Sequence, residues 1–291
     1  MMQELLFTRS NGQTVAYFDY GQSENVLFWH HGTPAAGPLS PLICRNADAN
    51  GLRIIEVVRP GYGSSTAISD RTVNTGSQID LEIADHLGIQ YFTVGGISGG
   101  GPHALASAHL AKGRCLALLI IAGLAPFDDP NFDFVEGLTE EDRKEWILPL
   151  TSMADFEVSV SKIAKEWASS DFNQIKKILN IDPDDSSSDE RISSFQALMQ
   201  YSFSQGSSGL RDDSLAFLKP WGFSMDEISM PVQLWVGSQD VNVPPSHSYF
   251  MNRMIPNSEL LVVEGKNHFT ISEPALADGF KWLRGNFTSH S

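Results

Sequence analysis

The chain has 291 residues, of which 42% are hydrophobic and 19% are charged, and its formal net charge at pH 7 is −15. This length and composition are typical of a folded chain with a sizeable core, and they exclude a largely disordered protein. The acidic balance argues against nucleic acid and anionic membrane as partners, because both bind surfaces rich in lysine and arginine.

The N-terminal segment MMQELLFTRSNGQTVAYFDYG predicts a β-hairpin with Asn11 and Gly12 at its turn. It has neither the basic start nor the apolar core of a signal peptide, and the sequence contains no run of about 18 apolar residues. Cys44 and Cys115 lack metal-ligand spacing, so we expect two buried free thiols in a reducing compartment. These features predict a cytoplasmic location.

Short apolar runs recur along the chain, and each ends in turn residues. They lie at 26–31, 53–58, 91–96, 116–123, 232–237 and 259–265. Continuous apolar runs of this length are typical of buried parallel strands. Helical patterns lie between several of them, including one closed by Gly88 and one closed by Gly113. The alternation predicts an α/β fold with a doubly wound sheet.

The alternation stops after residue 129 and resumes at residue 228. The intervening residues contain helix-like amphipathic segments and the acidic loop DPDDSSSDE at 182–190, but no strand-like run. Residues 128–219 carry 19 acidic and 9 basic side chains, which amounts to −10 of the total charge. We therefore expect a helical insertion that carries most of the negative charge.

The sequence GISGG at 96–100 fits the pattern G-x-S-x-G. A strand pattern precedes Ser98, and a helical pattern with Pro102 in its first turn follows. A sharp strand-to-helix turn strains its central residue and brings neighbouring backbone close, so the positions two before and two after need no side chain. The pattern predicts an exposed, nucleophilic Ser98 and a Gly99 N–H directed at a developing oxyanion.

A serine nucleophile needs a base, and the base needs a carboxylate to orient it. His268 is the best candidate among eight histidines, because it follows the last apolar run in the loop KNHFT. Asp240 follows the preceding apolar run in LWVGSQDVNVPP, and it is the candidate carboxylate. Asp128 and Asp129 are the alternatives for this role.

The segment FWHHGTPAAG follows an early strand and supplies a second candidate oxyanion donor. Gly32 permits close backbone approach, so the N–H of Thr33 can point at a substrate oxygen opposite Gly99. We expect His31 to brace this loop rather than to take part in chemistry. The glycines and proline of RPGYGSS, at 59–65, predict a structural turn.

Taken together, HGTP, RPGYGSS, GISGGG, PVQLWVGSQDVNVP and GKNHF resemble the motifs of the α/β-hydrolase superfamily, over essentially the whole chain. The resemblance implies an eight-stranded, mostly parallel, doubly wound sheet with a helical cap. It divides the chain into a first core segment at 1–126, the cap at 127–222 and a second core segment at 223–291.

The same resemblance implies the roles of the site residues. Ser98 would be the nucleophile, His268 the base, Asp240 its partner, and Thr33 and Gly99 the oxyanion donors. The implied activity is that of a carboxylesterase-like serine hydrolase that cleaves an ester or amide bond of a small molecule through an acyl-enzyme. No metal or cofactor is expected.

Other activities of the superfamily are less compatible with these residues. Epoxide hydrolases and haloalkane dehalogenases have Asp where this chain has Ser98. A proline iminopeptidase-like aminopeptidase is an alternative, but those enzymes carry Trp after the nucleophile and a loop like HGGPG, where this chain has Gly99 and HGTPA. A non-catalytic small-molecule receptor on the same fold is the alternative from another functional class.

Overall fold

The computed structural model describes residues 3–179, 181–182 and 189–287. It begins with a hairpin of two antiparallel strands, β1 (Glu4–Thr8) and β2 (Thr14–Tyr20). At the turn, Gly12 adopts a φ of 82°, and its N–H donates a 2.9 Å hydrogen bond to the carbonyl of Arg9. The predicted hairpin is therefore confirmed.

Within the described residues, eight strands form one sheet in the order β1-β2-β4-β3-β5-β6-β7-β8. The six strands after the hairpin are β3 (Val26–His30), β4 (Arg53–Val57), β5 (Phe92–Ile97), β6 (Cys115–Ile121), β7 (Val232–Gly237) and β8 (Ser258–Val263). The pairs β1–β2 and β2–β4 are antiparallel, and all other neighbours are parallel. The sheet is thus mostly parallel, as the sequence predicts.

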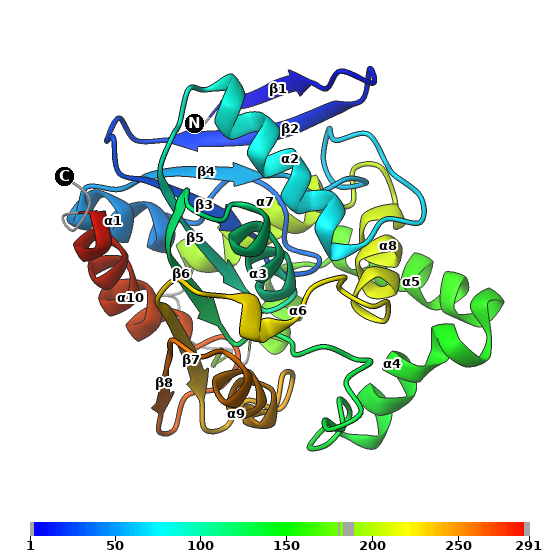
Figure 1. Ribbon diagram of the computed structural model, residues 1–291. Coiled ribbons are helices and arrows are strands. Elements are labelled where there is room, and N and C mark those ends of the chain that lie inside the picture. The colour runs from blue at the N-terminus through cyan, green and yellow to red at the C-terminus, as the bar shows by residue number, and fades with distance from the viewer. Residues whose placement is uncertain (1–2, 180, 183–188, 288–291) are drawn as a thin grey trace.

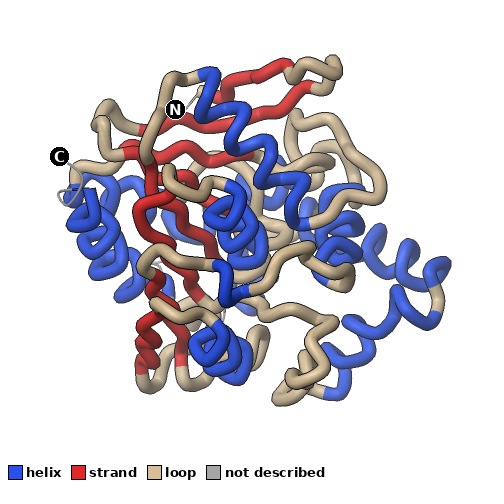
Figure 2. Tube along the Cα trace, viewed as in Figure 1, coloured by secondary structure: helices blue, strands red, loops and turns tan. Residues whose placement is uncertain are grey.

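Helices cover both faces of this sheet (Figures 1 and 2). They are α1 (Pro41–Asn50), α2 (Val73–His86), α3 (Gly100–Leu110), α9 (Pro245–Met254) and α10 (Ser272–Phe287). On one face α1 packs against α10, and on the other α2 packs against α3. The chain is therefore a three-layer α/β structure, which agrees with the predicted alternation of strands and helices.

Residues of β3 contribute alternately to the cores on the two faces. Val26 and Phe28 pack into the core that includes residues of α2 and α3, whereas Leu27 and Trp29 pack into the core that includes residues of α10. All four side chains are at least 98% buried. Because both faces are covered, every position of such a strand is apolar, which is why these strands appear in the sequence as unbroken apolar runs.

Between β6 and β7, the described residues form helices and no strand. Five α-helices lie there: α4 (Glu140–Thr151), α5 (Met153–Ala168), α6 (Phe172–Ile178), α7 (Asp189–Ser202) and α8 (Ser208–Phe217). Figure 1 shows α4 and α5 projecting farthest from the sheet, on the right of the view. The predicted helical insertion is confirmed, although most of the predicted acidic loop, at 183–188, lies outside the described residues.

Both cysteines are free, but only Cys115 is fully buried, whereas Cys44 is half-buried. The expectation of two buried thiols is thus right for Cys115 and right only in part for Cys44. Burial raises the pKa of the Cys115 thiol to about 12 and that of Cys44 to about 11. Both thiols are therefore protonated at neutral pH. Among the described residues, no helix combines the length and the apolar character needed to cross a bilayer.

One buried acid makes stability depend on pH. Glu56, on β4, is 3% exposed and accepts a 3.4 Å hydrogen bond from the N–H of Gly37. Burial raises the pKa of its carboxyl from 4.5 to about 8. A carboxyl whose pKa is higher in the folded state takes up a proton on folding. Its contribution to the stability of the fold is therefore fully present below pH 4.5 and is lost as the pH rises to about 8.

Replacing Glu56 with glutamine should remove this loss of stability at rising pH. The free energy of unfolding of Glu56→Gln, relative to the original chain, is expected to increase between pH 5 and pH 8 by up to about 1.4 kcal/mol for each pH unit. Urea denaturation at a series of pH values measures the difference. A difference that does not change with pH would contradict the assignment of a buried, protonated Glu56.

Candidate active site

Ser98 occupies the turn between β5 and α3, and its φ of 54° lies in the left-handed region that non-glycine residues rarely adopt. Two backbone hydrogen bonds hold this conformation. The N–H of Ser98 donates to the carbonyl of Ile121 at 2.8 Å, and its carbonyl accepts from the N–H of Gly101 at 2.9 Å. Strain of this kind persists only where the surroundings enforce it, and it is concentrated at functional sites.

Glycines allow this turn to pack against the end of β3. A Cβ on Gly96 would lie 2.5 Å from the carbonyl oxygen of Gly100. A Cβ on Gly100 would overlap the carbonyl oxygens of His30 and His31. Both glycines are required by close backbone contact, so the glycine pattern around Ser98 has a steric cause.

Ser98, His268 and Asp240 form a continuous chain of hydrogen bonds. His268 Nδ1 lies 2.8 Å from Asp240 Oδ2, and His268 Nε2 lies 3.0 Å from Ser98 Oγ. An ionised carboxylate only accepts hydrogen bonds, so Nδ1 carries the hydrogen and Nε2 is left to accept from the serine hydroxyl. The arrangement can transfer a proton from Ser98 to His268 while Asp240 holds the ring.

The loops that follow β7 and β8 hold these side chains in place. Asp240 Oδ1 accepts hydrogen bonds from the N–H groups of Asn242 and Val243, at 3.0 and 2.9 Å, and the residue is 3% exposed. Next to His268, the side-chain oxygen of Asn267 accepts from the N–H of Thr270 at 3.0 Å. Asp240 and His268 follow the neighbouring strands β7 and β8, and they meet Ser98, which follows β5, at the carboxyl-end edge of the parallel sheet.

Thr33, in the loop after β3, lies against the turn that carries Ser98. A Cβ on Gly99 would overlap Thr33 Oγ1 and would lie 3.0 Å from Phe217. Within the described part of the chain, the N–H groups of Thr33 and Gly99 have no hydrogen-bond acceptor. Two neighbouring unpaired N–H groups beside a serine hydroxyl can bind an oxyanion.

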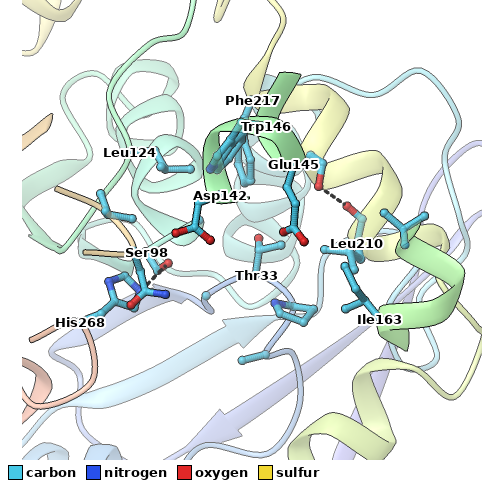
Figure 3. A pocket seen from close by; sticks show the side chains of 18 of the residues that line it. Thr33, Ser98, Leu124, Asp142, Glu145, Trp146, Ile163, Leu210, Phe217 and His268 are labelled. Carbon is cyan, nitrogen blue, oxygen red and sulfur yellow. Dashed lines mark hydrogen bonds between the residues drawn. The ribbon is translucent and has the colours of Figure 1, made fainter. Parts of the chain in front are cut away.

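These groups line a cavity of about 430 Å³ between the sheet and the insertion. Its wall is mostly apolar and includes the aromatic side chains of Trp146, Phe156, Trp167, Phe195, Phe217 and Phe269. Figure 3 shows Asp142 and Glu145 projecting from α4 toward the part of the cavity that holds Ser98 and Thr33. Burial, together with the nearby Asp142 and Glu141, raises the pKa of Glu145.

A buried ionic cluster lies beneath Thr33, and no sequence pattern predicts it. Asp213, on α8, is fully buried and forms ion pairs with Arg59 at 2.7 Å and Arg71 at 2.6 Å. In the sequence, Asp213 contributes only to the charge of the insertion, and Arg59 is only part of a predicted turn. That turn is present, since Gly61 and Gly63 have φ values of 89° and 48°. Sequence alone offers no signal that unites residues 154 positions apart.

The other histidine and aspartate candidates lie apart from this chain of hydrogen bonds. The Nε2 atom of His31 accepts from the N–H of Arg59 at 3.3 Å, so His31 braces its loop as expected. Asp129 Oδ1 accepts from the N–H of Asn131 at 2.9 Å, within its own turn. Within residues 3–179, 181–182 and 189–287, no group of three or more His, Cys, Asp or Glu is arranged to hold a metal ion. His290 lies outside the described residues.

The arrangement of the sheet and helices is the α/β-hydrolase fold, which confirms the fold implied by the motifs. An α/β-hydrolase fold protein from Nakamurella multipartita matches with 22% identity and a TM-score of 0.67, over 97% of this chain and 99% of that chain. A thermophilic esterase from Thermogutta terrifontis matches with 22% identity and a TM-score of 0.63, over 98% and 99%.

A structure from a study of carboxylesterases of Nitrososphaera gargenis matches with 17% identity and a TM-score of 0.69, over 99% of this chain and 100% of that chain. No protein-family model matches the sequence, and no curated protein matches it significantly. The chain therefore shares its fold, along its whole length, with hydrolases and esterases of low sequence identity.

Gly100→Ala should strongly destabilise the protein, because the added methyl group would overlap two backbone carbonyls that cannot move independently of β3. We expect the free energy of unfolding to fall by roughly 2 kcal/mol or more. Gly285→Ala in α10 is the matched control, because a Cβ there meets no atom within 4 Å. Thermal and urea denaturation measure both variants, and equal stabilities would contradict the steric role of Gly100.

Proposed function

We propose that the protein is a carboxylesterase-like serine hydrolase that cleaves an ester or amide bond of a small molecule. The observation that carries the proposal is the chain of hydrogen bonds from Ser98 through His268 to Asp240, with Ser98 in a strained left-handed conformation. The esterases among the structural neighbours support the same reaction class.

In the proposed acylation step, Ser98 Oγ attacks the carbonyl carbon of the substrate, and its proton passes to His268 Nε2. The carbonyl oxygen becomes an oxyanion, which the N–H groups of Thr33 and Gly99 stabilise. His268 then gives the proton to the leaving alcohol or amine as the bond to the carbonyl carbon breaks. Asp240 stabilises the imidazolium formed in between.

Deacylation repeats these events with water as the nucleophile. His268 takes a proton from the water, the hydroxide attacks the acyl carbon, and the same two N–H groups bind the second oxyanion. Collapse of the intermediate returns the proton from His268 to Ser98 Oγ and releases the carboxylic acid. Each proton transfer in this cycle goes to or from His268.

We propose that the insertion covers the site as a cap, with the chain divided into core segments at 1–126 and 223–291 and a cap at 127–222. The cap helices contribute much of the apolar wall, so the favoured substrates carry an apolar or aromatic group beside the scissile bond. The two free thiols support the cytoplasmic location that the sequence predicts.

Ser98→Ala is the first test of this function. The variant should lose about 10⁴-fold or more in kcat and should no longer react with a fluorophosphonate probe. Its melting temperature should stay close to that of the original chain, because the substitution removes one hydroxyl from the turn. Rates are measured over a panel of aryl esters with acyl chains of graded length.

The outcome of this test also decides between the functional classes. Turnover by Ser98→Ala within tenfold of the original rate would place the nucleophile elsewhere. An original chain that neither hydrolyses the panel nor reacts with the probe would favour a receptor. Hydrolysis of prolyl arylamides without hydrolysis of aryl esters would favour an aminopeptidase.

We further expect a preference against anionic substrates. Among the described residues, the cavity lining includes two carboxylates, Asp142 and Glu145, and no lysine or arginine. At low salt, kcat/KM for an ester that carries a carboxylate should be about tenfold or more below that of its neutral counterpart. The penalty should shrink as salt rises, because screening weakens the repulsion.

The double variant Asp142→Asn, Glu145→Gln should reduce this penalty. Glu140→Gln is the matched control, because its carboxylate lies on the same helix, is 80% exposed and pairs with Lys144 outside the cavity. Equal kcat/KM values for the neutral and the anionic ester at both salt concentrations would rule out the preference.

A further inference from the structure

The insertion reaches the loop of Thr33 through one buried carboxylate. Asp213, on α8, accepts a 2.6 Å hydrogen bond from the hydroxyl of Thr33. The hydroxyl of Tyr62 donates to the same carboxylate at 2.9 Å. Because the side chain of Asp213 is 0% exposed, water does not compete for these bonds.

Arg59 extends this contact to the backbone before Thr33. Its Nη1 donates to the carbonyl of His31 at 2.6 Å, and its Nη2 donates to the carbonyl of Gly32 at 3.3 Å and to the hydroxyl of Thr33 at 3.0 Å. The same guanidinium donates to Asp213 Oδ2 at 2.7 Å. Asp213 thus orients the guanidinium of Arg59, which binds the carbonyls of His31 and Gly32.

The direction of the Thr33 N–H follows from these contacts. The carbonyl of Gly32 and the N–H of Thr33 belong to one peptide group, which is planar and trans, so they point in opposite directions. Arg59 and the Nδ1 of His31, at 2.8 Å, hold the Gly32 carbonyl on the side of the buried cluster. The N–H of Thr33 is therefore turned away from that cluster.

Two neighbouring arginines keep the carboxylate of Asp213 ionised in this buried position. Burial alone would raise the pKa of Asp213, but Arg59 and Arg71 hold it well below its usual range. His103 lies 3.5 Å from Asp213, and burial and Arg59 lower its pKa to about 4. The cluster therefore contains two positive arginines and one negative carboxylate, with a neutral histidine beside them.

We propose that Asp213 is a positioning residue for the oxyanion site: through Thr33 and Arg59 it fixes the peptide group whose N–H binds the substrate oxygen. A residue of the insertion is thereby required for the geometry of a site built by the core. The inference rests on the proposed function, since it assigns a task to Asp213 in that reaction.

Asp213→Asn tests this role, because it keeps the shape of the side chain and removes the charge that orients Arg59. We expect kcat to fall by about ten- to a hundredfold with little change in KM, because the oxyanion forms only after substrate binding. The inhibition constant of an aryl boronic acid, whose adduct with Ser98 places an oxygen in the oxyanion site, should weaken by a similar factor.

Asp212→Asn is the matched control. Asp212 directly precedes Asp213 on α8, its side chain is 3% exposed, and it pairs with Arg211 instead of the Thr33 loop. This variant should keep kcat within about twofold even where its melting temperature falls. A purely structural role of Asp213 would lower the melting temperature of Asp213→Asn and leave the kcat and the boronic acid affinity of its folded fraction unchanged, which would overturn the proposal.

Thr33→Val provides a second, independent arm, because it removes the hydroxyl that bonds to Asp213 and keeps the backbone N–H. We expect a loss of kcat of tenfold or more. The double variant with Asp213→Asn should lose little more than the worse single variant, since both changes release the same peptide group. If Asp213→Asn does not fold, a Thr33→Val kcat within threefold of the original value overturns the proposal.

Ser98→Ala separates a failure of this inference from a failure of the proposed function. Loss of turnover in Ser98→Ala together with normal kcat in folded Asp213→Asn would overturn the role of Asp213 alone. Turnover that survives in Ser98→Ala would overturn the proposed function, and with it the role of Asp213.

Discussion

The close approach of the Ser98 turn to the end of β3 is the constraint on which the rest of the site depends. The carbonyl oxygens of His30 and His31 occupy the space where a side chain at position 100 would lie. This contact sets the turn beside the loop of Thr33, so that two N–H groups and a hydroxyl share one cavity. The sheet provides the rigid frame, because β3 and β5 are paired neighbours in it.

The acidic side chains of the insertion include two kinds, which lie in different environments. Asp142 and Glu145 line the cavity, whereas Asp212 and Asp213 are buried and paired with arginines. Only the first pair faces the cavity, where a charge can act on a molecule that enters it. The net charge of a segment therefore says little about the field in a neighbouring site until the partner of each charge is known.

The helices of the insertion are attached to the core to different extents. The helix α8 contacts α2 and is held by the buried ion pairs of Asp213, while α4 packs mainly against α5, within the insertion. The wall of the cavity is thus fixed at α8 and supported less directly at α4. Trp146 of α4 also faces α8, since its ring centroid lies 6.3 Å from that of Phe217.

By itself, the sequence determined the parallel strands, the hairpin, the helical insertion and the turn at Ser98, because each depends on a local pattern of apolar residues or glycines. It also indicated Asp240 and His268, since both follow apolar runs whose carboxyl ends meet at one edge of a parallel sheet. Only the tertiary structure brought Asp213 to Arg59 and Arg71, and Asp142 to the cavity. Those contacts join distant segments through side-chain packing. A local periodicity in the sequence does not indicate which distant charges share a buried site.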